Sequence, residues 1–159
     1  MKKSILLVAL LCCLSARAQL VIDGMGSFLY WSLADLDNRM RLGIISFGDS
    51  VTLHLRNLSL EKNEGNGNYV CKLAEHDLGF YRVGPYCPAT VLVFIKSFLV
   101  DGFSLHFVGC PEEELKRYLR SSYGKPHEES NGQFYWFASR VSIMATTSDV
   151  GYMVIFKRK

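Results

Sequence analysis

Beyond its first eighteen residues, the sequence lacks the features that would place it in several common classes of protein. No later stretch reaches the 18 to 20 or so uncharged apolar residues of a bilayer-spanning helix. The histidines and cysteines show none of the Cys-x-x-Cys, His-x-x-x-His or His-Glu-x-x-His spacings of zinc sites. No internal repeat or low-complexity tract is present. These absences argue against a membrane-spanning protein, a zinc protein and a repeat protein.

The sequence also has little net charge once its leader is set aside. Removing Lys2, Lys3 and Arg17 lowers the 18 basic residues to 15, which equals the 15 acidic residues. A charge of zero over residues 19–159 removes the argument for nucleic acid binding, and no motif for a cofactor is present. The remaining chain has the size of a single domain, and the hydrophobic content of 49% over the whole sequence excludes intrinsic disorder.

The first eighteen residues are typical of a signal peptide. Two lysines, Lys2 and Lys3, precede an apolar run from Ile5 to Leu14, and Ala16-Arg17-Ala18 has the small-x-small pattern that a signal peptidase recognises. We therefore expect a mature chain that starts at Gln19 and is exported to the periplasm or secreted. The short leader with two lysines indicates a bacterial source.

The cysteines leave two questions open. Neither Cys12 nor Cys13 follows the small residue that a lipid-modified cysteine needs, which disfavours a lipid anchor. Three cysteines remain after export: Cys71, Cys87 and Cys110. An oxidising compartment favours one bridge among them, and Cys71 with Cys87 closes a short loop that would contribute about 3 kcal/mol. The alternative is three unpaired thiols.

Two helices are predicted, one of them strongly. Pro111 precedes three glutamates and later basic residues, and Leu115, Tyr118, Leu119 and Ser122 recur on one face before Gly124, which predicts a helix over about 111–123.

The second predicted helix is shorter. Ser32 and Asp35 have the spacing of a capping box, and Gly43 would end this helix. A hairpin that turns at Asp37-Asn38 is the rival interpretation.

Most of the remaining chain reads as strands. Alternation over Val51–Leu55 predicts a half-buried strand, and the polar Glu61–Asn68 reads as a loop before a strand near Tyr69. Two final strands are expected over Gln133–Ala145 and Tyr152–Lys157.

A hairpin is expected at the centre of the fold. Asp101-Gly102 separates the apolar Thr90–Val100 from the alternating Phe103–Phe107, which is typical of a type I′ turn. The continuous apolar run Val91–Ile95 favours a strand covered on both faces. Together these elements predict a two-layer α+β domain over 19–159, with a mostly antiparallel sheet covered by one main helix.

One motif resembles a catalytic site. Phe47-Gly48-Asp49-Ser50 follows the apolar Ile44-Ile45 and resembles the nucleophile block of the GDSL or SGNH esterases, which would make Ser50 the nucleophile. The family's Asp-x-x-His and Gly-x-Asn-Asp blocks have no counterpart, and Gly, Asp and Ser are also turn residues. The sequence favours a turn here, with an ester hydrolase using Ser50 as the alternative function.

Aromatic residues are the other candidates. Consecutive aromatics at 135–137 must face opposite sides of a strand, so some of them could be exposed for a protein or glycan partner. The candidate binding residues are Tyr81, Tyr86, Tyr135 and Trp136.

The C-terminal third carries a family resemblance. Leu115–Pro126, Tyr135-Trp136 and Val141-Ser142-Ile143 resemble segments of small exported Bacteroidota proteins of uncharacterised function, whose leaders end in Ala-Gln as Ala18-Gln19 does here. The resemblance implies export and the same architecture, and it supplies no catalytic residues. We therefore expect a non-enzymatic binding or inhibitory module.

Overall fold

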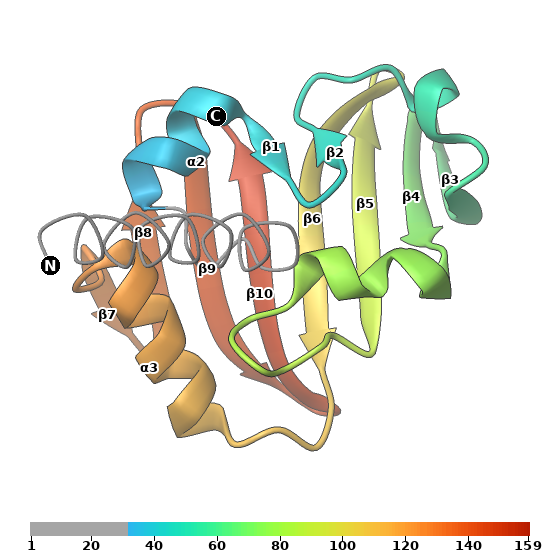
Figure 1. The fold of residues 1–159 in the computed structure, drawn as a ribbon. Helices are drawn as coiled ribbons and strands as arrows, with labels where there is room; N and C mark the ends of the chain where they lie inside the picture. Colours follow the sequence, from blue (N-terminus) through green and yellow to red (C-terminus); the bar gives the residue numbers. More distant parts are fainter. Residues whose placement is uncertain (1–31) are drawn as a thin grey trace, which may run out of the picture.

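The computed structural model describes residues 32–159, in which the main element is an eight-stranded sheet (Figure 1). All neighbouring strands in it pair antiparallel, in the order β3-β4-β5-β6-β10-β9-β8-β7. The predicted leader and its cleavage site lie outside the described residues. The strands are β3 (Leu58–Gly65), β4 (Asn68–Leu73), β5 (Thr90–Lys96), β6 (Leu99–Phe107), β7 (Glu128–Ser130), β8 (Gln133–Phe137), β9 (Val141–Ser148) and β10 (Gly151–Arg158).

Several elements together cover one face of this sheet (Figure 1). Figure 1 shows α3 (Glu112–Tyr123), α2 (Leu33–Arg39), the 3-10 helix η3 (Glu75–Tyr81) and a two-stranded hairpin on this face, and α3 is the longest of them. The predicted α+β class with a mostly antiparallel sheet is therefore confirmed, while the cover is shared among elements. They are α2 (Leu33–Arg39), β1 (Arg41–Leu42), β2 (Ile45–Ser46), η3 (Glu75–Tyr81) and α3 (Glu112–Tyr123), and a further 3-10 helix is η2 (Val51–His54).

Helix α3 packs on the sheet through its apolar stripe. Leu115, Leu119 and Tyr123 are buried, and the Tyr123 ring lies edge-on to Trp136 at 6.2 Å and to Phe156 at 6.4 Å. Gly124 ends the helix at φ 79°, as predicted. This contact between α3, β8 and β10 fixes which face of the C-terminal strands is covered.

The short helix α2 is present, so the rival hairpin at Asp37-Asn38 is wrong. Ser32 and Asp35 form the predicted capping box, in which the Ser32 hydroxyl accepts from the Asp35 N–H. The helix ends at Met40 rather than at Gly43, because Met40 takes the left-handed conformation. Gly43 instead lies in the β1–β2 turn, where the Tyr81 ring occupies the space that a Cβ would need.

The central hairpin exists, but its predicted turn is wrong. Strands β5 and β6 are joined by Ser97 and Phe98, which both have positive φ. Tertiary contacts hold this turn, because the Ser97 N–H donates to the Asn68 side chain and the Phe98 N–H donates to the Gly67 carbonyl. Asp101 and Gly102 lie inside β6, where Asp101 is the extra residue of a β-bulge opposite Phe94 and Ile95.

Two expectations before β4 are also wrong. Val51–Leu55 is not a strand: η2 spans Val51–His54, and Leu53 and Leu55 are exposed. The polar segment Glu61–Asn68 was expected to be a loop, but its first part is strand, because β3 continues to Gly65. An edge strand with one unpaired side is commonly polar and charged, which explains why its sequence reads as a loop.

The C-terminal strands follow the prediction with one change. The segment Gln133–Ala145 is broken into β8 and β9. The turn between them is fixed by Asp37, whose carboxylate accepts from the N–H groups of Arg140 at 2.6 Å and Val141 at 3.2 Å. Strand β10 forms where Tyr152–Lys157 was predicted and extends one residue further at each end.

Candidate functional site

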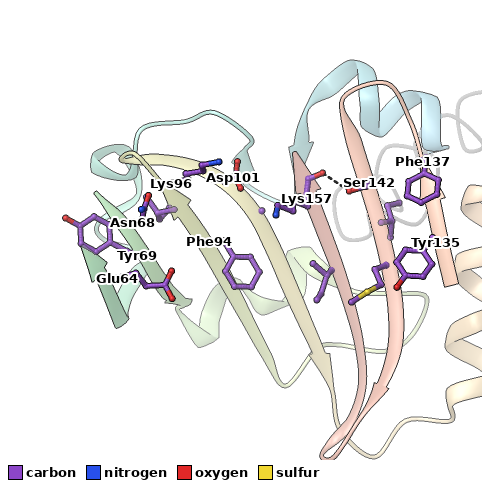
Figure 2. A pocket seen from close by; sticks show the side chains of 15 residues that line it. Glu64, Asn68, Tyr69, Phe94, Lys96, Asp101, Tyr135, Phe137, Ser142 and Lys157 are labelled. Carbon is purple, nitrogen blue, oxygen red and sulfur yellow. Dashed lines mark hydrogen bonds between the residues drawn. The ribbon is translucent and has the colours of Figure 1, made fainter. Parts of the chain in front are cut away.

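An open groove lies on the face of the sheet opposite to α3 (Figure 2). It has a volume of about 650 Å³, and its residues come from β3, β4, β5, β6, β8, β9 and β10. The lining residues are Glu64, Asn68, Tyr69, Phe94, Ile95, Lys96, Asp101, Gly102, Tyr135, Phe137, Ser142, Ile143, Met144, Ile155 and Lys157.

Strand alternation explains how one sequence makes a core on one face and a groove on the other. In β5, Val91, Val93 and Ile95 are buried under the covering helices, while Leu92 and Phe94 are half-buried on the opposite face. Strands β9 and β10 repeat this pattern. The predicted cover on both faces of β5 is therefore wrong for the described residues, since Figure 1 shows their helices on one side only.

The middle of the groove is apolar. Met144 and Ile155 are direct neighbours across β9 and β10, and Phe94 lies on β5 beyond the intervening β6. Phe94 pairs with Gly102, and its ring lies 3.4 Å from the position of a Cβ at that glycine. The glycine thus lets the aromatic ring lie against the strand. These side chains remain partly exposed because nothing among residues 32–159 covers them.

One wall of the groove is aromatic. Tyr135 and Phe137 alternate along β8 and stack at 6.1 Å with an interplanar angle of 18°. The Tyr135 hydroxyl donates to the Gln133 side chain at 2.5 Å, which holds the ring in place. Trp136 between them points to the opposite face and is buried, so the expected division of aromatics 135–137 between two faces is confirmed.

The ends of the groove carry its charges. Lys96, Asp101 and Lys157 lie together at one end (Figure 2). The same three residues line a second hollow of about 310 Å³ that adjoins the first and also contains Arg158. At another border Glu64 forms an ion pair with Lys62 at 2.8 Å.

Of the four aromatic residues expected to bind a partner, the structure places only Tyr135 in the groove. Tyr81 and Trp136 are buried in the core, and burial raises the pKa of the Tyr81 hydroxyl. Tyr86 lies on the covered side of the molecule, where its hydroxyl donates to the Glu114 carboxylate. This hydrogen bond raises the pKa of Tyr86 to about 12.

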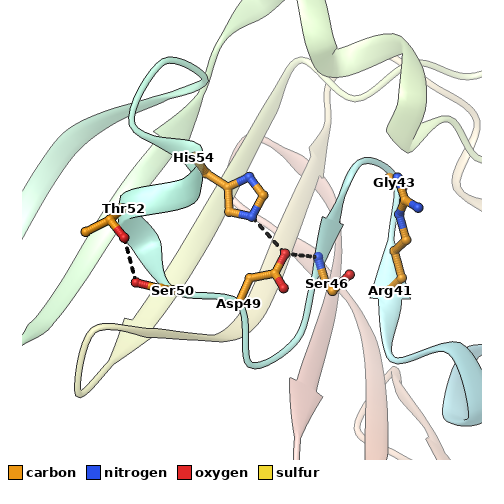
Figure 3. A network of polar contacts seen from close by, with 7 residues as sticks. All are labelled: Arg41, Gly43, Ser46, Asp49, Ser50, Thr52 and His54. Atoms are coloured by element: carbon orange, nitrogen blue, oxygen red, sulfur yellow. Dashed lines mark hydrogen bonds and ion pairs between the residues drawn. The ribbon is translucent and has the colours of Figure 1, made fainter.

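The esterase-like segment forms a turn followed by a short bridge to β6 (Figure 3). The Gly48 N–H donates to Val100, and Ser50 pairs with Leu99. Ser50 Oγ is hydrogen-bonded to Thr52 Oγ1 at 2.8 Å, whereas His54 Nε2 lies 2.8 Å from Asp49 Oδ2.

These contacts leave Ser50 without a catalytic partner within the described part of the chain. Figure 3 shows the Ser50 side chain directed toward Thr52 and the His54 ring directed toward Asp49. No hydrogen bond joins Ser50 to a histidine among residues 32–159. A serine nucleophile needs such a base, so the geometry fits a structural turn.

The expected disulfide between Cys71 and Cys87 is not formed. Cys71, Cys87 and Cys110 are all free. Cys71 is buried on the core face of β4, whereas Cys87 lies exposed in the loop before β5, so the two side chains occupy different environments. Burial raises the pKa of both the Cys71 and the Cys110 thiols, which does not favour a reactive thiolate.

Sequence reasoning missed most of the groove. Phe94, Met144, Ile155 and Lys157 come from three strands, and only the pairing register brings them together. One sequence signal pointed to part of the groove. Leu92 and Phe94 make β5 apolar on both faces, although the described helices cover only one face of the sheet.

Comparisons of the chain with models of known protein families, with curated proteins and with solved structures found no match. Within residues 32–159, no cluster of three or more His, Cys, Asp or Glu side chains could hold a metal ion. The helices in that range are all too short or too polar to cross a bilayer.

Proposed function

We propose that the protein is an exported, non-enzymatic binding module that holds an apolar small molecule in the groove on the open face of its sheet. In this proposal α3 is the main cover of the structural face of a two-layer domain, and the opposite face is left for the ligand. The observation that carries the proposal is the apolar centre of the groove, formed by Phe94, Met144 and Ile155.

The size and chemistry of the groove support a small apolar ligand. Small-molecule sites generally measure about 300 to 1,000 Å³ and combine apolar walls with a few polar groups, and the groove of about 650 Å³ falls within that range. Methionine adapts to ligands of irregular shape, and Met144 lies near the centre. A contiguous exposed apolar surface commonly marks a binding site.

The same features favour an apolar ligand over a glycan. Recognition of a sugar requires polar groups that converge on its hydroxyls, but the centre of the groove presents the apolar side chains of Phe94, Met144 and Ile155. The stacked rings of Tyr135 and Phe137 provide an aromatic wall that suits an apolar chain or ring equally well.

Binding of a neutral apolar dye tests the proposal. We expect N-phenylnaphthylamine to bind the folded protein with a rise in fluorescence. Ile155→Asp places a charge in the groove and should weaken binding about tenfold or more, which corresponds to about 1.4 kcal/mol. The matched control is Met153→Asp, since Met153 is half-buried two residues away on the same strand and face but does not line the groove.

A second control addresses the alternative hydrolase. Ser50→Ala should leave dye binding unchanged, because Ser50 lies outside the groove. Circular dichroism confirms that each variant is folded. The proposal fails if the dye does not bind, if Ile155→Asp and Met153→Asp weaken it equally, or if the wild-type protein hydrolyses esters and Ser50→Ala abolishes that activity.

A further inference from the structure

We propose that the groove selects a single-chain anionic amphiphile, whose apolar chain lies over Phe94 and Ile155 and whose anionic head lies between Lys96 and Lys157. The inference rests on the proposed function and adds the chemical class of the ligand. Its basis is the position of two lysine side chains at one end of an otherwise apolar groove.

Both lysines are available to a ligand. Lys96 at the end of β5 and Lys157 in β10 are exposed, and Lys157 pairs with Gly102 in the strand that separates them. Neither forms an ion pair with another residue of the range 32–159. Figure 2 shows both side chains at the same end of the groove, above the apolar floor. Each ammonium group therefore keeps its hydrogen-bond donors for a bound anion.

The acidic residues of the groove do not cancel this charge. Glu64 is paired with Lys62, so Asp101 is the carboxylate that lies with the two lysines. The β-bulge in β6 places Asp101 as an extra residue beside Gly102. One carboxylate against two ammonium groups leaves a positive excess at this end of the groove.

The adjoining hollow provides room for the head. The hollow has a volume of about 310 Å³. It adjoins the groove, because Lys96, Asp101 and Lys157 border both. A ligand with a chain in the larger space and a charged head in the smaller space would use both volumes. The apolar surface lies within a groove of limited volume, which favours one free chain over the surface of a bilayer.

Matched ligands that differ only in the head test the inference. A fatty acid, the fatty alcohol and the alkylamine of the same chain length are titrated as monomers against the bound neutral dye. We expect the acid to compete about fivefold better than the alcohol at low salt, and the amine to compete worst. The ratio of acid to alcohol should shrink as salt is added, because both lysines are exposed.

Charge variants give the second arm of the test. The double variant Lys96→Gln, Lys157→Gln should reduce the ratio of acid to alcohol to about one, whereas Asp101→Asn should raise it by removing the competing carboxylate. The matched control is Lys72→Gln, which removes a lysine from the same face of the sheet outside the groove and should leave the ratio unchanged.

The outcomes separate this inference from the proposed function. If acid and alcohol compete equally and the lysine variants change nothing, the head-group inference is wrong while apolar binding stands. If neither ligand displaces the dye, both proposals are wrong. If the protein binds anionic phospholipid vesicles and not the monomeric acid, the inference is overturned in favour of a membrane surface.

Discussion

The two faces of the central sheet are built from the same strands but differ in how their side chains are covered. On the face under α3, Phe103 and Leu105 of β6 are fully buried. On the other face, Phe94 and Ile155 remain partly exposed along the groove. A sheet with one solvated face normally alternates apolar and polar residues. The open face here departs from that pattern, since apolar side chains occupy its centre.

The departure supports the proposed binding role, because exposed apolar surface adds little to folding. Burial of a side chain stabilises a fold in proportion to the apolar area removed from water, and Phe94 loses only part of its area. The ring centroid of Phe103 instead lies 5.0 Å from that of Phe47 and 6.1 Å from that of Tyr81. The covered face therefore supplies stability, and the open face is free to bind a ligand.

The largest expected effect comes from a matched pair of phenylalanines. Phe103→Ala should lower the free energy of unfolding by about 3 to 5 kcal/mol, because it leaves a cavity among buried rings. Phe94→Ala should cost about 1 kcal/mol or less, as is usual for a partly exposed site, while it weakens dye binding. Chemical denaturation of both variants checks this, and equal losses of stability would break the distinction between the faces.

A second, smaller effect is expected at Gly102. A Cβ at this position would lie 2.7 Å from the Phe156 carbonyl oxygen, so Gly102→Ala should destabilise the protein by about 1 to 3 kcal/mol through overpacking.

Gly79 is the control, because its φ is ordinary and nothing lies within 4 Å of a Cβ built there. Gly79→Ala should be neutral in denaturation, and a neutral Gly102→Ala would contradict the close packing of β6 against β10.

The elements that could be predicted are those specified by local chemistry. The helix over 112–123 follows from its charged ends, its apolar stripe and the stop at Gly124. Helix α2 follows from the capping box of Ser32 and Asp35. In each case the residues that decide the structure lie within a few positions of one another, so the sequence contains the interaction that forms.

The central turn could not be predicted because distant residues decide it. Asp101-Gly102 has the better local signal for a type I′ turn, but the chain turns at Ser97-Phe98. Gly67 allows the Phe98 ring to pack against it, since a Cβ there would lie 2.5 Å from that ring. Contacts with the β3–β4 turn thus stabilise a conformation that Ser97 and Phe98 would not favour alone.

The candidate site was predictable at one residue, Tyr135. The others depend on strand order, which brings β5 and β8 onto one face although many residues separate them in the chain. Consecutive strands along the sequence are not all neighbours here, since β6 pairs with β10. Local sequence patterns therefore predict neither this crossover nor the groove that depends on it.

The smallest expected effect concerns His106, which lies on the open face of β6 beyond the groove. Its ring is hydrogen-bonded to Ser104 at 2.9 Å, and burial lowers the pKa of His106 below its ordinary value of 6.5. As the pH falls below about 6.5, the unfolded chain therefore takes up a proton more readily than the folded protein does. The free energy of unfolding should fall in that range and stay unaffected by this group at higher pH.

His106→Gln should reduce this loss of stability when denaturation at about pH 8 is compared with about pH 5. Equal losses in wild type and variant would contradict this prediction, because they would show that folding does not lower the pKa of His106.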